Sequence, residues 1–175
     1  RHRDRTVAHM RRIKKSDRQH EALHTPAGWV ASMSGIGLLP TAPGTWASAA
    51  TLPLGWVIAA WQGPWAVLAA SLIVFAVGVY ASSQVIRRIE TDDPSVIVID
   101  EMAGQLLTLV FAPLTWQAYL AAFLAFRFFD LTKIWPASWL DREIGGGFGA
   151  MADDMLAGLY GMLVILGAVH MGWLS

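Results

Sequence analysis

The sequence predicts an all-α, polytopic membrane protein with about four to five membrane helices. The first observation behind this prediction is composition: of 175 residues, 55% are hydrophobic and 15% are charged, which is too apolar for an ordinary soluble domain. The second is that residues 25–86 contain no Asp, Glu, Lys, Arg or His. Because roughly 20 residues cross a bilayer once, this segment must fold back on itself.

Residues 1–24 are predicted to form a basic cytoplasmic arm, and residues 25–175 a single membrane-embedded catalytic domain. The formal net charge is zero, yet eight of the 13 Lys and Arg residues lie between Arg1 and Arg18. Such a segment is attracted to anionic lipid by about 1 kcal/mol per basic residue. A solvated tail that sets the membrane topology fits the same pattern. Since there is no Cys, disulfides and thiolate nucleophiles are excluded.

A first helical hairpin is expected over residues 45–61 and 64–86, because Gln62, Gly63 and Pro64 are the strongest turn signal within the uncharged segment. Its flanking residues Trp61 and Trp65 suit a membrane interface. The preceding residues 35–45 are too rich in Gly and Pro for a regular helix. We expect them to form a loop or a re-entrant segment.

A second, re-entrant or helical hairpin is expected around Pro113, in the apolar stretch 102–126. A single span there would carry Arg127, Lys133 and Arg142 to the outside, whereas a hairpin that turns at residues 113–115 keeps every Lys and Arg on one side. Its arms are either short or extend through residues 95–112 and 116–135. Residues 155–173 form the last predicted span, which leaves the C-terminus outside.

The acidic residues are concentrated in two short windows. Every Asp or Glu after Glu21 falls within residues 90–101 or 130–154. The predicted hairpin brings these windows together on the cytoplasmic side. Ionisable groups close to hydrocarbon cost a few kcal/mol each and are usually paired or functional, so this arrangement indicates a site.

Three groups of charged residues in these windows have two interpretations each. Arg127, Asp130 and Lys133 share one helical face, where two cations flank a carboxylate as either a surface ion-pair ladder or part of the site. Asp153 and Asp154 come after a Gly-rich turn, at the predicted head of the last helix, where they either cap that helix or bind a hard divalent ion. The pair Asp100 and Glu101 either begins a helix or supplies two more ligands to the same ion.

Other chemistries are not supported. Residues 35–45 could line an anion-binding concavity but lack the Lys-Ser/Thr ending of a P-loop. Four of the five His residues lie in the basic arm, His170 lies in the last span, and no G-x-S-x-G motif is present. Nucleotide binding and acyl transfer are therefore not predicted, no nucleic-acid partner is expected, and the oligomeric state is left open.

Four motifs follow one another between Gly35 and Gly158. They are Gly35-x-Gly37-x-x-Pro40-x-Ala42-Pro43-Gly44-Thr45, Asp100-Glu101-x-x-Gly104, Arg127-x-x-Asp130-x-x-Lys133 and Gly146-Gly147-x-Gly149-x-Met151-x-Asp153-Asp154-x-x-Ala157-Gly158. In this order they resemble the phosphatidylglycerophosphatase A family of bacterial membrane lipid phosphatases. Two residues depart from the pattern of that family, since this chain has Ala47 and Ile134 where the family usually has Gly and Pro.

The resemblance implies Mg²⁺-dependent hydrolysis of phosphatidylglycerophosphate to phosphatidylglycerol and phosphate, on the cytoplasmic side of the bacterial inner membrane. Asp130 would orient Lys133 or act as a general base. The remaining implied site residues fall into two sets. Those expected to hold the metal and the attacking water are Asp100, Glu101, Asp153 and Asp154; those expected to contact the substrate are Arg127, Lys133, Gly44, Thr45, Gly146 and Gly147.

Two other functions remain open from the residues. A phosphatase that acts on another lipid phosphate would show the same polar windows. A small ion-coupled transporter would also place carboxylates in the membrane, but transporters tend to have duplicated halves, and no duplication is present in this sequence.

Overall fold

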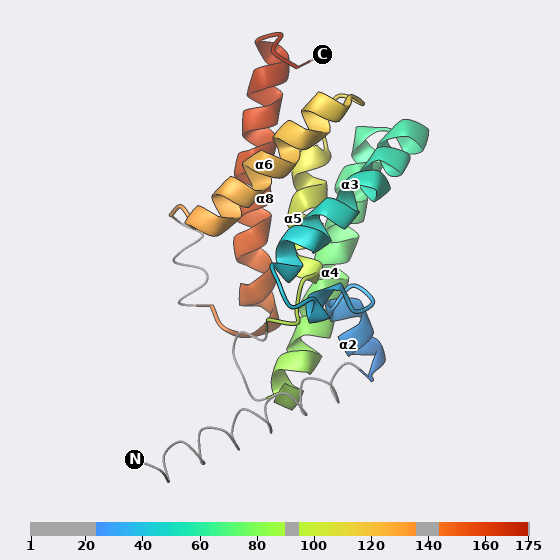
Figure 1. The fold of residues 1–175 in the computed structure, drawn as a ribbon, viewed down its shortest axis with the longest axis vertical. Helices are drawn as coiled ribbons and strands as arrows, with labels where there is room; N and C mark the ends of the chain where they lie inside the picture. The colour runs from blue at the N-terminus through green and yellow to red at the C-terminus, as the bar shows by residue number, and fades with distance from the viewer. Residues whose placement is uncertain (1–23, 90–94, 136–143, 175) are drawn as a thin grey trace.

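The computed structural model describes residues 24–89, 95–135 and 144–174, and every regular element in these ranges is helical. The all-α prediction is therefore confirmed, whereas the predicted basic arm lies almost wholly outside the described residues. The elements are α2 (Pro26–Ala31), the 3-10 helix η1 (Ile36–Leu38), α3 (Pro43–Gln62), α4 (Pro64–Ile89), α5 (Ile99–Leu109), α6 (Trp116–Thr132) and α8 (Gly146–His170). Figure 1 shows the longer helices side by side, with α2 near one end of α4.

Two of the described helices, α4 and α8, are long and apolar enough to cross a membrane. The expected count of four to five membrane helices was therefore too high on this criterion. Helix length explains part of the difference. With 11 residues, α5 is about 16 Å long, which is roughly half of the hydrocarbon core, and α6 has only 17 residues.

The first hairpin is confirmed, with longer arms than expected. Helix α3 ends at Gln62 and α4 begins at Pro64, so that Gly63 alone separates them, with a φ of 80° and an N–H that donates to the carbonyl of Ala59. At the other end of α4, Arg87 and Arg88 occupy the last turn, where cations favour the helix dipole.

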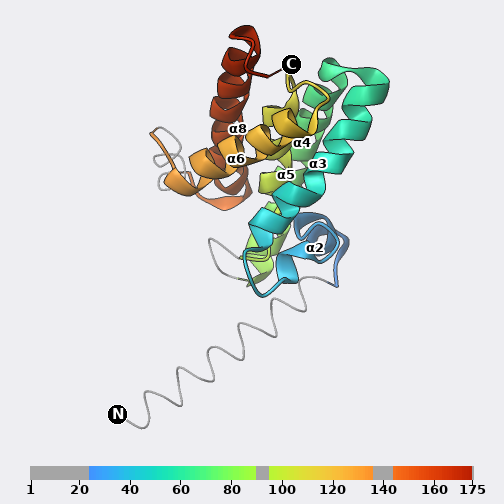
Figure 2. The same ribbon diagram turned by 45° about the horizontal axis from the view of Figure 1, so that its top comes forward.

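The second hairpin is confirmed as two helices joined by a turn around Pro113, with bounds between the two expected forms, because α5 is shorter than the expected 95–112 whereas α6 nearly fills 116–135. Helix α5 ends at Leu109 and α6 begins at Trp116, where the hydroxyl of Thr115 accepts a hydrogen bond from the N–H of Ala118 at 3.3 Å. Figures 1 and 2 place this turn, the α3–α4 turn and the C-terminal end of α8 at the same end of the molecule. Four tryptophans close to these three chain positions are strongly exposed, as expected for an interfacial belt; they are Trp61, Trp65, Trp116 and Trp173.

Of residues 35–45, which were predicted to be irregular, residues 35–42 form an irregular segment that includes η1, whereas residues 43–45 already belong to α3. The segment is fixed against the chain that leads into α5. A Cβ atom on Gly37 would overlap the carbonyl oxygen of Val96, and the N–H of Val98 donates to the carbonyl of Ala31 at 2.9 Å. The loop before α3 therefore packs against the segment that leads into α5.

Helix α5 lies at the centre of the bundle, and eight of its 11 residues are buried. It crosses α8 at Gly104 and Gly158, where a Cβ on Gly158 would overlap the carbonyl oxygen of Gly104. The hydroxyl of Thr108 lies 3.1 Å from the carbonyl oxygen of Gly158 and donates to it. Small residues at such crossings let two helix backbones come close together, as in many membrane proteins.

Helix α6 turns two charged side chains inward near its C-terminal end and presents an apolar outer face. The side chains of Arg127 and Asp130 face inward and are 14% and 13% exposed. The exposed side chains are apolar and recur with helical spacing, at Leu120, Leu124, Phe128 and Leu131. Inward charges combined with an apolar outer face are the arrangement expected of a helix whose outer surface contacts lipid.

Replacement of Gly158 by Ala is expected to lower the thermal unfolding temperature, because the added methyl group would force α5 and α8 apart at their closest point, at a cost of about 1–3 kcal/mol. Gly167→Ala is the matched control in the same helix, since a Cβ there meets nothing within 4 Å. Thermal unfolding in detergent measures both variants. If Gly158→Ala melts no lower than Gly167→Ala, the close crossing is not required.

Candidate active site

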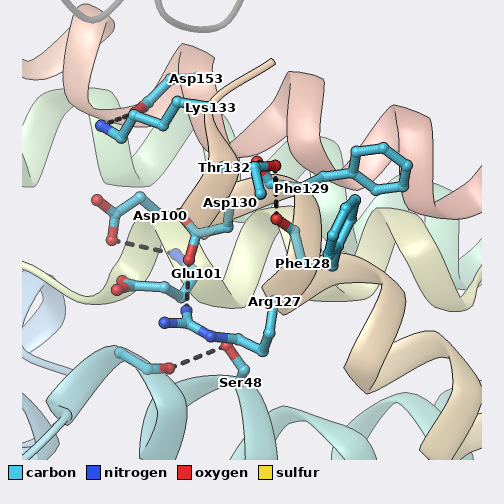
Figure 3. Close-up of polar contacts among 11 residues, drawn as sticks. Ser48, Asp100, Glu101, Arg127, Phe128, Phe129, Asp130, Thr132, Lys133 and Asp153 are labelled. Atoms are coloured by element: carbon cyan, nitrogen blue, oxygen red, sulfur yellow. Dashed lines mark hydrogen bonds and ion pairs between the residues drawn. The ribbon is translucent and has the colours of Figure 1, made fainter.

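A cavity of about 320 Å³ lies where the N-terminal ends of α3 and α5 meet α6 and the first turns of α8. Figure 3 shows its charged side chains. Its lining includes all seven charged residues predicted for the site, together with Gly44. The lining residues are Ala42, Pro43, Gly44, Ser95, Ile97, Val98, Asp100, Glu101, Arg127, Asp130, Lys133, Ala150, Asp153 and Asp154.

Three carboxylates converge in this cavity. Asp100 and Glu101 stand in the first turn of α5, and Asp154 approaches from α8. Each offers an oxygen that lies within 4.8 Å of the oxygens of the other two. Among the described residues, Oε2 of Glu101 and Oδ2 of Asp154 are buried without a hydrogen-bond partner.

This group fits a hard divalent cation. Three like charges at this separation repel one another strongly in a poorly solvated site unless a cation or protons neutralise them. Neither described histidine, His24 nor His170, lines the cavity, so the ligand set consists of carboxylate oxygens. Mg²⁺ prefers such ligands.

Gly44 has a clear role in placing Glu101. A Cβ atom at residue 44 would overlap Oε1 of Glu101, so the carboxylate can lie against the beginning of α3 only because this residue is glycine. The positive end of a helix dipole favours an anion at that position. Gly44, which was predicted to contact substrate, thus lines the cavity and makes room for a candidate ligand.

The two cations of the cavity are each paired with an acid. Nη1 of Arg127 lies 2.7 Å from Oδ2 of Asp130, and Nζ of Lys133 lies 2.8 Å from Oδ2 of Asp153. Lys133 is the C-cap of α6 and has a φ of 43°, which turns the chain at the point where its side chain meets α8 (Figure 3). Asp130 therefore orients Arg127, and Asp153 orients Lys133.

The pairing separates Asp153 from the other predicted metal ligands. The sequence grouped four carboxylates, but the structure brings Asp100, Glu101 and Asp154 together and places Asp153 on Lys133. Adjacent residues on a helix point about 100° apart, so Asp153 and Asp154 cannot face the same point equally well.

The expected start of the last helix at residue 155 was wrong. Helix α8 begins at Gly146, so Asp153 and Asp154 lie two turns inside it and do not cap it. The glycines that indicated a turn are packing positions. A Cβ on Gly147 would overlap Ser83 and the backbone of α4, and one on Gly149 would overlap the carbonyl of Ile144.

Three residues predicted to contact substrate, Thr45, Gly146 and Gly147, are not among those that line the cavity. Conversely, sequence reasoning missed the short segment before α5, which contributes Ser95, Ile97 and Val98. No motif marks these three residues. Their position directly before Asp100 was the only available signal.

The sequence model of one protein family, described as Phosphatidylglycerophosphatase A, matches residues 29–169. Two proteins named Phosphatidylglycerophosphatase A are similar over most of the chain. The Haemophilus influenzae protein is 37% identical over 145 residues, which cover 82% of this chain and 89% of that protein. The Escherichia coli protein is 38% identical over 139 residues, which cover 76% and 78% respectively.

A third relative has a different name. The Bacteroides thetaiotaomicron protein named "Putative phosphatidylinositol-3-phosphatase" is 34% identical over 139 residues, which cover 75% of this chain and 86% of that protein. No solved structure matches the chain.

Asp154→Asn and Asp153→Asn are expected to behave differently, although the two residues are adjacent. Asp154→Asn removes one of the three like charges of Asp100, Glu101 and Asp154, so without metal the protein should unfold at an equal or higher temperature. The variant should also lose its stabilisation by Mg²⁺, and its turnover should fall by orders of magnitude. Asp153→Asn should keep the stabilisation by Mg²⁺ and chiefly raise KM, because Lys133 loses its ionic partner.

Thermal unfolding with and without Mg²⁺, together with phosphate release, measures both variants. Equal stabilisation of the Asp154→Asn variant and the wild-type protein by Mg²⁺ would contradict the assignment of Asp154 as a ligand. Loss of the Mg²⁺ response in the Asp153→Asn variant would show that both residues serve the metal.

Proposed function

The chain belongs to the phosphatidylglycerophosphatase A family, and from this premise we propose that it hydrolyses the terminal phosphomonoester of phosphatidylglycerophosphate in a Mg²⁺-dependent reaction. Membership makes it a phosphatase. The observation that carries the proposal is the grouping of three carboxylates and two ion-paired cations around one cavity. A phosphomonoester dianion needs both kinds of group, because its hydrolysis depends on charge neutralisation and positioning.

Asp100, Glu101 and Asp154 would hold the Mg²⁺. When bound, the ion supplies Lewis acidity, which polarises a phosphoryl oxygen. The three carboxylates come from two helices that are locked together at Gly104 and Gly158, so their spacing is fixed before the substrate arrives. Such preorganisation is what makes electrostatic stabilisation effective.

Arg127 and Lys133 would bind the remaining phosphate oxygens. Each is held by one carboxylate, at 2.7 Å and 2.8 Å, so neither long side chain has to be ordered when the substrate binds. Arg127 presents a planar set of donors that suits phosphate, and Lys133 acts as a point charge. Asp130 and Asp153 therefore position the two phosphate-binding cations.

The proposed reaction is direct attack by water. The water oxygen bonds to phosphorus in line with the leaving group, the bond between phosphorus and the glycerol oxygen breaks, and that oxygen takes up the proton that the attacking water gave to Asp130. Asp130 lines the cavity and offers a carboxylate that can accept the proton of the attacking water. We prefer this route to a phospho-enzyme because the chain lacks the local signature of a phosphorylated aspartate.

The substrate would approach from the bilayer leaflet on the side of Arg87 and Arg88, the cytoplasmic side by the positive-inside rule. Support comes from the apolar outer face of α6, directly behind the charged residues of the site, and from the candidate spans α4 and α8. The protein would then be a multi-pass enzyme of the bacterial inner membrane.

A second candidate substrate class is another lipid phosphate, which the name of the Bacteroides thetaiotaomicron relative favours. The charged groups recognise phosphate in either case.

Purified protein is expected to release inorganic phosphate from phosphatidylglycerophosphate. This release should stop in excess chelator and resume when Mg²⁺ is restored, because the ligand set consists of carboxylates. Phosphatidic acid and phosphatidylinositol 3-phosphate serve as comparison substrates in the same mixed micelles. Faster release from either of these would assign the protein to the second class. Full turnover in chelator would eliminate the metal-dependent mechanism.

The topology can be tested with single cysteines, since residues 1–175 contain none. Cysteines that replace Gln62 and Leu114, at the α3–α4 and α5–α6 turns, are expected to react with an impermeant maleimide added to intact cells or spheroplasts. A cysteine that replaces the exposed Arg88 should react only after permeabilisation. Labelling of residues 88 and 114 from the same side would rule out the proposed arrangement.

A further inference from the structure

The cavity has one uncharged side chain that can form hydrogen bonds, and the mechanism above does not use it. Seven of the described lining residues are charged, and all the uncharged ones except Ser95 have apolar side chains or none. Ser95 therefore supplies the only hydroxyl of the lining that the structure describes. A serine hydroxyl both donates and accepts hydrogen bonds, whereas a carboxylate only accepts them and an ammonium or guanidinium group only donates them.

Ser95 lies at the mouth of this cavity. Among the described lining residues, only Ala42 and Ser95 are exposed, whereas the side chains that carry charge are at least partly buried, down to Asp154 at 5%. Three residues beyond Ser95, Val98 is only 1% exposed. The segment before α5 therefore runs inward from the mouth, and Ser95 is its polar side chain at the outer end.

The backbone that follows Ser95 is held by the loop before α3. The carbonyl oxygen of Val96 lies so close to Gly37 that a Cβ atom there would overlap it, and the N–H of Val98 donates to the carbonyl of Ala31 at 2.9 Å. The hydroxyl of Ser95 is thus accessible to a ligand and is attached to anchored backbone. Groups that are held in place before a ligand binds lose less entropy when it arrives.

The proposed substrate carries a hydroxyl close to the phosphate that is removed. In phosphatidylglycerophosphate, the terminal phosphate is attached to a glycerol unit whose middle carbon bears a free hydroxyl, and a phosphodiester joins this glycerol to the diacylglycerol. Where Arg127, Lys133 and the three carboxylates take the terminal phosphate, this glycerol is the next group toward the mouth of the cavity. Phosphatidic acid has no such glycerol.

We propose that Ser95 is a specificity-determining residue, whose hydroxyl forms a hydrogen bond with the free hydroxyl of the head-group glycerol. The inference rests on the proposed function and names the part of the headgroup that the cavity recognises besides phosphate. A site that binds a substrate hydroxyl in this way disfavours an analogue that lacks it. Because Ser95 is exposed, the discrimination is that of one neutral hydrogen bond, about 3–10-fold in kcat/KM.

The experiment compares two substrates of the purified protein in the same mixed micelles with Mg²⁺. One is phosphatidylglycerophosphate, and the other is its deoxy analogue, in which propanediol replaces the head-group glycerol and the free hydroxyl is absent. The wild-type protein is expected to hydrolyse the deoxy analogue with a kcat/KM that is about 3–10-fold lower. Ser95→Ala should lower kcat/KM for phosphatidylglycerophosphate by the same factor and leave that for the deoxy analogue unchanged, so that the preference disappears.

Two further variants separate the hydroxyl from other effects of the substitution. Ser95→Thr keeps a hydroxyl and should keep the preference for phosphatidylglycerophosphate. Ser83→Ala is the matched control, because the hydroxyl of Ser83 donates to the carbonyl of Val79 at 2.7 Å in its own helix and the residue does not line the cavity. This control should hydrolyse both substrates at wild-type rates.

A wild-type protein that hydrolyses both substrates equally well would overturn the inference and leave the proposed function standing. The inference would also be overturned if the Ser95→Ala variant kept the preference, or if it lost activity toward both substrates to the same extent. If the wild-type protein releases no phosphate from phosphatidylglycerophosphate, the proposed function itself fails, and the inference fails with it.

Discussion

The close crossing of α5 and α8 is the constraint on which the site depends. Gly104 and Gly158 have no side chains, so the two backbones come close enough for the hydroxyl of Thr108 to bridge them. That contact sets the position of Asp154 beside Asp100 and Glu101, although more than 50 residues separate them in the chain. A site built on helix backbones in contact is more rigid than one built on loops.

The balance of charge in the cavity follows from which acids are paired. Five carboxylates and two basic side chains line it. Two of the acids, Asp130 and Asp153, neutralise Arg127 and Lys133, which leaves three acids that have no basic side chain of the cavity as an ion-pair partner. An apolar bundle tolerates such an excess only where a further cation or protons complete the site, because uncompensated buried charge is strongly destabilising.

Sequence reasoning found the elements with strong local signals. The turn at Gly63 and the hairpin around Pro113 were correct, because Gly and Pro restrict the backbone directly. It failed where glycine served packing between helices: residues 145–149 indicated a turn, but Gly147 lets α8 lie against α4, and the helix starts at Gly146. Local sequence cannot separate these uses of glycine, since the neighbour that requires the close approach is distant in the chain. For the same reason it could not assign Asp153 to Lys133.

The residues that we propose bind phosphate cannot by themselves select one lipid headgroup. In that proposal, Arg127, Lys133 and the three carboxylates would interact with the charge and geometry that every phosphomonoester shares. Relatives with differently named substrates are 34–38% identical to this chain. Under the proposed function, discrimination would depend on uncharged parts of the lining, where the loop before α3 contributes Ala42 and the segment before α5 contributes Ser95 and Ile97. Side chains at such positions can change without loss of the charges proposed to bind phosphate.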